Sequence, residues 1–518
     1  MAKSKQFLRK ILIRLVVAAI GIGCICAGVG TLERERFGLV IEQFQVGQTP
    51  VTVYRRAGGA VAPAVVIAHG FAGSRQLMEA YALTLARAGY VAVSLDFEGH
   101  GRNPTPMSGD VTSVDGTTQL LMREIGRVTD FALALPSVDG SIGLLGHSMA
   151  SDIVVRQAIE DPRVSATVAI SMFSQAVTAS EPRKLLIITG ELESFLRQAA
   201  LRNAQLVDAA AGEGETVGDP SIGTVRRAIV APKVEHVGVL YSATALREAR
   251  AWFDAVFGRE SRGQVSATGG PIALLLSGIV ILAWPLSTLL PRGKTTPLPL
   301  SPKTFLMAVL IPAALTPVLL SFAETRFLPV LVADYLAAHM FVYGLTSLGV
   351  LIWYGVSLGR VAWFSAFALA GYGIFVFGGA IDRYVASFWP IEPRLWIIAI
   401  IAIGALPYMI GDSVVTEGGR ARLWRVLSAR AAFIASLGLA VALDFERLFF
   451  LLIIIPVIIL FFIVFGLMGA WVGRRTNSPC AAGIALGVLL AWAIGVSFPM
   501  FTSNHAPPPT SSTNAEQY

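Results

Sequence analysis

Residues 142–150 read Ile-Gly-Leu-Leu-Gly-His-Ser-Met-Ala, and this stretch decides the fold of the part of the chain around it. Its first four residues form a short apolar run, which predicts a buried strand, and helical spacing begins at Met149. Ser148 therefore lies on a sharp turn from strand to helix, where side chains two positions before and after it would collide. Gly146 meets this requirement. Ala150 stands where a second glycine is usual, so we expect slightly wider packing between helix and strand.

Further short apolar runs, often rich in β-branched residues, predict five more buried strands. They lie at 64–68, 91–95, 164–170, 185–189 and 228–230. Stretches with helical spacing occur near 75–88, 117–134, 149–159 and 240–257. This alternation predicts an α/β domain with a mostly parallel sheet, whose functional groups gather where the strands end.

Two motifs directly follow predicted strands. The first is His69-Gly70-Phe71-Ala72-Gly73-Ser74, and the second is Asp96-Phe97-Glu98-Gly99-His100-Gly101. Together with the serine turn, these motifs resemble those of the α/β-hydrolase family over roughly residues 50–258. The resemblance implies the α/β-hydrolase fold and a serine-dependent hydrolysis, and it leaves the substrate open. We expect His69 and His100 to support their loops.

By this resemblance, Ser148 is the nucleophile, and the backbone N–H groups of Phe71 and Met149 form the oxyanion hole. The family's order of serine, acid and histidine along the chain requires a histidine after the last strand. His236 lies there, between the strand at 228–230 and the helix near 240–257. His100 precedes the nucleophile, so we do not expect it to be the base.

Two glutamates are candidates for the acid that orients the histidine. The strand at 185–189 is followed by Gly190-Glu191-Leu192-Glu193. The family's acid usually stands three residues after such a glycine, which favours Glu193, and Glu191 remains the alternative. With either acid, the roles predict attack on an ester, thioester or amide carbonyl through an acyl-enzyme, and a carboxylic ester is the expected substrate.

The chain as a whole is far more apolar than a soluble protein. Of its 518 residues, 54% are hydrophobic and 14% are charged, whereas roughly 25% charged residues are usual. A basic N-terminus precedes an apolar run from Ile11 to about Gly30, which predicts a membrane-spanning signal anchor or a cleaved signal peptide. About eight further apolar spans follow, at roughly 272–290, 305–323, 328–356, 362–380, 395–413, 431–443, 448–472 and 480–501.

These patterns predict four parts of the chain. Residues 1–32 form the N-terminal anchor, and 33–270 form the α/β-hydrolase domain. Residues 271–502 form an all-α domain with several membrane spans, and 503–518 form a disordered tail rich in proline, serine and threonine. The soluble part has no cysteine, because the three cysteines are Cys24, Cys26 and Cys480.

The positive charges between spans predict the orientation in the membrane. If the N-terminus is cytoplasmic, fourteen lysines and arginines fall in the inner segments and four, Arg326, Arg383, Arg394 and Arg447, fall in the short outer loops. An excess of positive charge is typical of cytoplasmic loops. We therefore expect a multi-pass integral membrane protein with a cytoplasmic N-terminus and an extracytoplasmic hydrolase domain.

The expected partners are the lipid bilayer and an acyl-containing small molecule or lipid-like substrate. Only about fourteen residues separate the strands that end near 170 and begin near 185, so the large cap often inserted there is absent. We hypothesise that the membrane domain or the bilayer surface forms the missing wall. The sequence contains no phosphate-binding loop, no dinucleotide glycine fingerprint and no histidine pair at metal spacing, so we expect no cofactor, metal or nucleic acid.

Two other functional classes compete with the enzyme. A transporter or membrane sensor could use the exported domain only to bind a ligand, and Asp334 and His339, which fall within the span at 328–356, would then be of interest. A structural membrane protein with a decayed enzyme is the third possibility, supported only by Ala150 and Glu193. A complete set of serine, acid and base favours the enzyme, because a binding module needs no such set.

Overall fold

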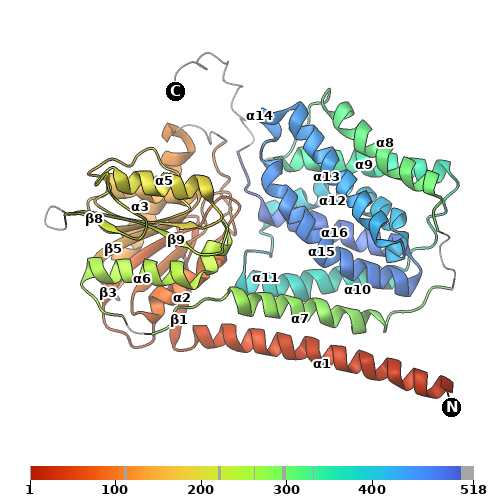
Figure 1. Ribbon diagram of the computed structural model, residues 1–518, viewed down its shortest axis with the longest axis horizontal. Coiled ribbons are helices and arrows are strands. Elements are labelled where there is room, and N and C mark those ends of the chain that lie inside the picture. The colour runs from red at the N-terminus through yellow and green to blue at the C-terminus, as the bar shows by residue number, and fades with distance from the viewer. Residues whose placement is uncertain are drawn as a thin grey trace.

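The computed structural model describes residues 2–109, 114–219, 223–261, 263–294, 299–330 and 332–502. The expected disordered tail lies outside these residues. Figure 1 shows a sheet flanked by helices at one end of the molecule and a bundle of helices beside it; the N-terminal helix runs along the bundle, and its C-terminal end reaches the sheet. The fold class predicted from the sequence is confirmed: a mostly parallel sheet, an N-terminal apolar helix and a helical C-terminal region.

The sheet has nine strands in the order β1-β2-β4-β3-β5-β6-β7-β9-β8. The bounds are β1 Leu39–Val46, β2 Thr49–Arg56, β3 Ala62–Ala68, β4 Val91–Leu95, β5 Val138–His147, β6 Val164–Ile170, β7 Lys184–Gly190, β8 Thr216–Asp219 and β9 Thr224–Ala231. Strands β3, β4, β5, β6, β7 and β9 pair in parallel. These six are the strands that the sequence predicts. The three antiparallel strands β1, β2 and β8 were not predicted.

Helices cover both faces of this sheet. Side chains alternate along β3, so Val65 and Ile67 pack with helices α2 (Glu79–Arg87) and α6 (Ala243–Phe257), whereas Ala64 and Val66 pack with α3 (Gln119–Leu133) and α4 (Met149–Glu160). A fifth helix, α5 (Ser194–Gln205), was not predicted from the sequence. The strands are therefore buried on both faces, as parallel strands require.

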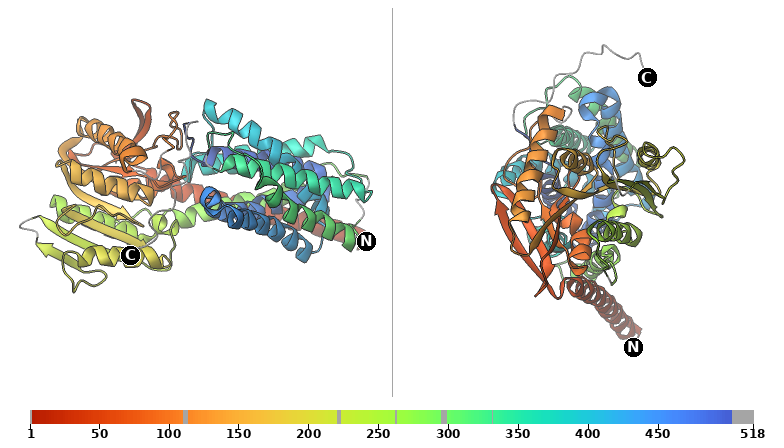
Figure 2. Two further views of the ribbon diagram at one scale, coloured as in Figure 1. Left: turned by 90° about the horizontal axis from the view of Figure 1, so that it is seen from above. Right: turned by 90° about the vertical axis from the view of Figure 1, so that its left-hand side faces the viewer.

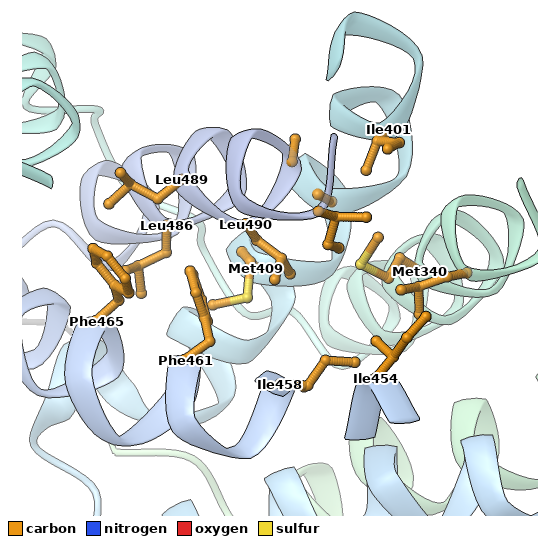
Figure 3. Packing of buried hydrophobic residues seen from close by; sticks show 14 of the residues in the cluster. Met340, Ile401, Met409, Ile454, Ile458, Phe461, Phe465, Leu486, Leu489 and Leu490 are labelled. Atoms are coloured by element: carbon orange, nitrogen blue, oxygen red, sulfur yellow. The ribbon is translucent and has the colours of Figure 1, made fainter. Parts of the chain in front are cut away.

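Nine helices in the described part of the chain are long and apolar enough to cross a membrane. The first is α1 (Ala2–Arg36), and the other eight correspond to the predicted spans. Their bounds are α7 Gly269–Ser287, α8 Pro302–Leu320, α9 Ala333–Trp353, α12 Glu392–Val415, α13 Leu423–Leu443, α15 Leu451–Thr476 and α16 Pro479–Ser497. The span Trp363–Tyr384 consists of α10 (Trp363–Gly371), η4 (Tyr372–Phe377) and α11 (Gly378–Tyr384), and the short α14 is Phe445–Leu448. Figure 3 shows side chains such as Met340, Met409 and Phe461 that meet in the apolar core of this bundle.

Helix α1 packs along α7 through small residues. A Cβ added at Gly278 would lie 2.8 Å from both the Gly21 carbonyl oxygen and Cys24 Cβ. Small residues allow two membrane helices to approach closely. Helix α1 is therefore part of the bundle, and its last turn reaches the sheet domain, where Arg36 forms an ion pair with Glu79.

The loops of the bundle lie at two opposite ends. Figures 1 and 2 place the N-terminus at the end far from the sheet domain. At the far end, Arg475 donates to the Leu290 carbonyl at 2.7 Å, and Arg425 donates to that of Leu300 at 3.0 Å. At the near end, Arg383 forms an ion pair with Glu33 at the end of α1. The loops predicted to be inner from their positive charge thus lie at the far end of the bundle, and those predicted to be outer lie at the end near the sheet domain.

The edge of the sheet where the parallel strands end faces the bundle. After β3, Ser74 Oγ accepts a hydrogen bond from the Ser387 backbone N–H at 3.1 Å. After β4, Arg102 donates to both carboxylate oxygens of Asp382, at 2.9 and 2.7 Å. Asp382 lies in the last turn of α11, and Ser387 lies in the segment that joins α11 to α12. The two domains are thus joined at the edge where an α/β domain carries its functional site.

A buried arginine fixes this contact. Arg394, at the start of α12, is 1% exposed and donates hydrogen bonds to three carbonyl oxygens, those of Gly99 at 2.8 Å, Gly495 at 3.0 Å and Phe498 at 2.7 Å. The chain after α16 runs beside the same loop, because Met500 N–H donates to Gly99 O at 2.9 Å. One guanidinium thus connects the loop after β4 with α16.

We expect Arg394→Met to destabilise the full-length protein strongly, because three buried carbonyls would lose charge-assisted hydrogen bonds worth about 1.5–3 kcal/mol each. The melting temperature in detergent micelles, followed by tryptophan fluorescence, should fall by about 5 °C or more. Arg383→Met is the matched control, because its half-exposed ion pair with Glu33 contributes only about 0–1 kcal/mol. Equal melting temperatures for the two variants would contradict this account.

Candidate active site

Ser148 occupies the turn between β5 and α4 in a backbone conformation that is rare for a residue with a side chain. Its φ is 53° and its ψ is −119°, and its backbone N–H donates to Ile170 O at 2.8 Å. A Cβ added at Gly146 would lie 2.4 Å from the Ala150 carbonyl oxygen and 2.8 Å from Val154 Cγ2. Only glycine fits at position 146, whereas the buried Ala150 is accommodated as it stands.

The structure brings together the serine, histidine and glutamate that the sequence singles out. His236 Nε2 lies 2.8 Å from Ser148 Oγ, and His236 Nδ1 lies 2.5 Å from Glu193 Oε1. His236 follows β9, and Glu193 follows β7, so three different strand ends contribute to the group. In this arrangement Nδ1 donates to the carboxylate, which leaves Nε2 free to accept the serine proton.

The second oxygen of Glu193 is held by two donors. Oε2 accepts hydrogen bonds from Ser171 Oγ at 2.8 Å and from the Gly190 backbone N–H at 2.6 Å. Burial alone would raise the pKa of Glu193, but the hydrogen bonds from His236, Gly190 and Ser171 outweigh burial and lower that pKa below its usual value. The carboxylate is therefore charged and fixed toward His236. Ser171 was not foreseen from the sequence.

Glu191, the alternative acid, lies elsewhere. Its side chain is exposed, and Oε2 accepts a hydrogen bond from the Lys233 backbone N–H at 2.7 Å. This contact fastens the loop after β9, which carries His236 three residues later. The structure thus pairs Glu193 with His236 and gives Glu191 a contact to the backbone of the same loop.

The loop after β3 packs closely against the serine turn. A Cβ at Gly70 would lie 2.9 Å from Ser148 Cβ and 3.1 Å from the His147 carbonyl oxygen, so the Phe71 backbone follows directly beside the serine. His69 holds this loop: its Nδ1 lies 2.8 Å from Gly70 O, and its Nε2 accepts from the Phe97 N–H at 3.2 Å. The N–H of Met149 is in the first turn of α4, where no carbonyl of the same helix can accept it.

His147 is a contact residue that the sequence analysis did not foresee. Its Nε2 lies 2.9 Å from the His236 carbonyl oxygen, and the two rings are 4.9 Å apart. Burial, together with the nearby His236, lowers the pKa of His147 to about 3. The ring is therefore neutral near pH 7 and can donate its Nε2 proton to the backbone of His236, which steadies that loop.

The loop after β4 has the supporting role expected from its sequence. Asp96 is buried and accepts backbone N–H groups from Arg75 at 2.8 Å and Arg102 at 3.1 Å. His100 is buried with its ring 5.8 Å from that of Phe71, and its Nδ1 lies 2.9 Å from Glu98 O. Burial lowers the pKa of His100 well below its usual value, so a neutral ring packs behind the loop that carries Phe71.

Exposed apolar side chains lie close in sequence to the residues of this site. Residues 171–183, between β6 and β7, contain no helix, in agreement with the missing cap. The apolar rim, as we call it, consists of exposed side chains within two residues of Ser171, Glu193 or His236 along the chain, namely Phe173, Leu192, Phe195 and Val237. On the other side, the ring of Phe71 lies 5.4 Å from that of Phe450 in the bundle.

Comparisons with known proteins find similarities in sequence and in structure. Residues 59–216 match the family model described as "Serine aminopeptidase, S33". One similar solved structure is Est1E from Butyrivibrio proteoclasticus, with 14% identity, coverage of 42% of this chain and 99% of that chain, and a TM-score of 0.31. Another is a predicted CIB-like hydrolase from Thermoplasma acidophilum, with 14% identity, coverage of 42% of this chain and 98% of that chain, and a TM-score of 0.32. No curated protein matches the chain in sequence. The resemblance seen in the motifs is confirmed.

We expect Gly146→Ala to destabilise the protein by about 2–3 kcal/mol, because the added methyl group meets the backbone of α4. Gly126→Ala in α3 is the matched control. The nearest atom to its new Cβ is Gln157 Nε2 at 3.7 Å, so the gain in helix propensity should stabilise the protein by up to about 1 kcal/mol. Melting temperatures of the two variants should shift in opposite directions, and a shift of the same sign would refute the close packing at Gly146.

Proposed function

Residues 59–216 lie in an α/β-hydrolase domain, and from this premise we propose that the chain is a membrane-bound serine hydrolase that cleaves a carboxylic ester. The observation that carries the proposal is the continuous set of hydrogen bonds from Ser148 through His236 to Glu193, on a serine at φ 53°. A strained turn and an ordered base are what an activated serine requires.

The proposed reaction follows from the roles of these groups. His236 Nε2 takes the proton of Ser148 as Oγ attacks the acyl carbonyl, and the backbone N–H groups of Phe71 and Met149 stabilise the oxyanion. His236 then gives the proton to the leaving alcohol, and an acyl-enzyme remains. Water, activated by the same histidine, releases the acid. The charged Glu193 stabilises the imidazolium that forms in both steps, and a thioester or amide would follow the same path.

The site faces the membrane in this proposal. Nine apolar helices are compatible with a multi-pass protein, and the positive charges at the far end of the bundle favour a cytoplasmic N-terminus. The hydrolase domain would then lie outside, with the edge that carries Ser148 turned toward the membrane. Loops that touch the bundle and loops that hold the triad belong to the same edge, so a substrate would enter beside the bilayer surface.

An amphiphilic acyl substrate fits this position best. The rings of Phe71, Phe450, Phe449 and Phe445 form a series with centroids 5.4, 5.5 and 5.6 Å apart, which leads from beside Ser148 onto the outer end of the bundle. Phe445 and Phe449 are exposed, and so is the apolar rim. Aromatic surface beside the reacting carbonyl favours a substrate with a hydrocarbon chain. The bundle would thus serve as the wall that a cap supplies elsewhere.

A domain that only binds a ligand is the alternative. It would need a cleft but not an ordered base, and the two donors on Glu193 Oε2 serve only to aim that carboxylate at His236. The same contacts argue against a decayed enzyme. Glutamate is one methylene longer than the more frequent aspartate, and Glu193 still lies at hydrogen-bonding distance from His236.

The test of an activated serine is labelling of native membranes with a fluorophosphonate probe. We expect the wild type to be labelled. Both Ser148→Ala, which lacks the nucleophile, and His236→Ala, whose serine is a weak nucleophile without its base, should lose labelling by at least about 1,000-fold in rate. Wild-type protein that is folded, as judged by its elution in size-exclusion chromatography, and yet unlabelled would refute the hydrolase.

The amphiphilic substrate predicts a chain-length effect in Phe450→Ala. For long-chain p-nitrophenyl esters, kcat/KM should fall about 10- to 100-fold, since an aromatic contact with the chain is worth about 1.5–3 kcal/mol, whereas the loss for the acetate ester should be much smaller. Phe367→Ala, an exposed phenylalanine on α10, is the control and should behave as wild type. An equal loss for short and long esters in Phe450→Ala would contradict the chain-binding role.

A further inference from the structure

The end of α15 is joined to the segment that follows α7 at the far end of the bundle. Arg475 donates from Nε to the Leu290 carbonyl oxygen at 2.7 Å, and Asn477 donates from Nδ2 to that of Gly293 at 2.8 Å. A Cβ added at Gly293 would overlap the backbone at the end of α15, so the two segments are in direct contact. Arg292 precedes this glycine and is therefore held close to Arg475.

A third arginine approaches the same place from α1, which lies along α7 (Figure 1). A Cβ added at Gly28 or Gly21 would lie 2.9 or 3.0 Å, respectively, from atoms of α7. Another seven residues, about two helical turns, lead along this face of α1 to Arg14. The charge of Arg475 is repelled by those of both Arg14 and Arg292. We call these three residues the arginine cluster.

No carboxylate of the described residues balances the arginine cluster. Within that part of the chain, the side chains of Arg14 and Arg292 form no hydrogen bond or ion pair, and Arg475 uses one of its N–H groups, for the Leu290 carbonyl. Two acids near the far end, Glu417 and Asp412, pair with other arginines at 3.1 and 3.4 Å. The cluster thus presents guanidinium N–H donors that have no acceptor.

Membrane orientation alone does not account for this convergence. The orientation requires only that positive charges lie on one side of the membrane. Arg422, which is exposed at the start of α13 and has no polar partner for its side chain among the described residues, meets that requirement by itself. Bringing three guanidinium groups together from α1, α15 and the segment after α7 adds repulsion, which a bound anion would offset.

Exposed apolar side chains accompany the arginine cluster. Leu12 and Leu15 lie within two residues of Arg14 along α1, and Leu289 lies three residues before Arg292. All three leucines are more than half exposed. At the end of a membrane span, such side chains face the hydrocarbon chains of lipids while nearby arginines reach the headgroup region. The surroundings therefore suit an anion that carries hydrocarbon chains.

We propose that the arginine cluster binds the phosphate group of an anionic phospholipid. Guanidinium groups match phosphate oxygens in geometry as well as in charge, and basic sites between membrane helices are suited to lipid headgroups. The acyl chains would lie along α1 and Leu289. Because the cluster joins α1 to the ends of α7 and α15, the bound lipid would hold α1 against the bundle. This site is separate from the proposed hydrolase site.

The test is native mass spectrometry of the full chain in detergent, titrated with dioleoyl phosphatidylglycerol. The wild type should bind the first molecule of this lipid with a Kd at least about tenfold lower than that for dioleoyl phosphatidylcholine, which has the same chains but no net charge. Arg14→Gln and Arg292→Gln should each raise the Kd for phosphatidylglycerol about fivefold, because each removes one positive charge at the headgroup.

The matched control is Arg422→Gln, which removes the same charge from an exposed arginine outside the cluster; its Kd should stay within about twofold of the wild type. Equal weakening by Arg422→Gln and Arg292→Gln would overturn the proposal, because binding would then follow the overall charge. Equal Kd values for the two lipids would also overturn it. So would displacement of phosphatidylglycerol by an equal concentration of glycerol 3-phosphate, since the ligand would then be a soluble anion. Elution in size-exclusion chromatography establishes that each variant is folded.

Discussion

The six parallel strands all end at one edge of the sheet, and everything proposed for the hydrolase site depends on what that edge contacts. The turns after β5, β7 and β9 bring Ser148, Glu193 and His236 together there. The loops after β3 and β4 leave the same edge and bind the membrane bundle, with the buried Arg394 holding the Gly99 carbonyl. The candidate site and the contact with the helical bundle therefore share one surface, because the functional groups of a parallel sheet gather where its strands end.

This arrangement gives the bundle a structural role in the site. No helix covers the site between β6 and β7, and the exposed apolar rim and the contact of Phe450 with Phe71 supply apolar surface near it. The contact between the two domains combines the ion pair of Arg102 with Asp382 and hydrogen bonds from side chains to backbone groups, as between Arg394 and the Gly99 carbonyl. These directed bonds fix the orientation of the two domains. Inside the bundle, Met340 of α9 belongs to the same apolar core as Met409, Phe461 and Leu490 of the neighbouring helices (Figure 3).

Much of the fold and the grouping of the candidate residues could be predicted from the sequence. Ser148, His236 and Glu193 each follow a short apolar strand, and strand ends converge whatever the details of packing. Strands β1 and β8 were missed because they lie at the two edges of the sheet and lack long apolar runs. Strand β2 is an inner strand, but Thr52 separates its two valines, and α5 was missed because its burial is limited to alanines. Ser171 and Phe450 could not be predicted, because no local sequence pattern marks them and only the folded chain brings them to the site. Arg394 was counted merely as one charge of an outer loop, although it is buried between both domains.

The central claim is that an activated serine lies at the interface between the hydrolase domain and the bundle. The most direct measurement is a cryo-electron microscopy structure of the full chain in lipid nanodiscs after reaction with a long-chain alkyl fluorophosphonate. The account predicts phosphonate on Ser148 Oγ, its oxygen about 2.7–3.1 Å from the N–H groups of Phe71 and Met149, and its alkyl chain against Phe450. A phosphonate on another residue, or a hydrolase domain detached from the bundle, would contradict it.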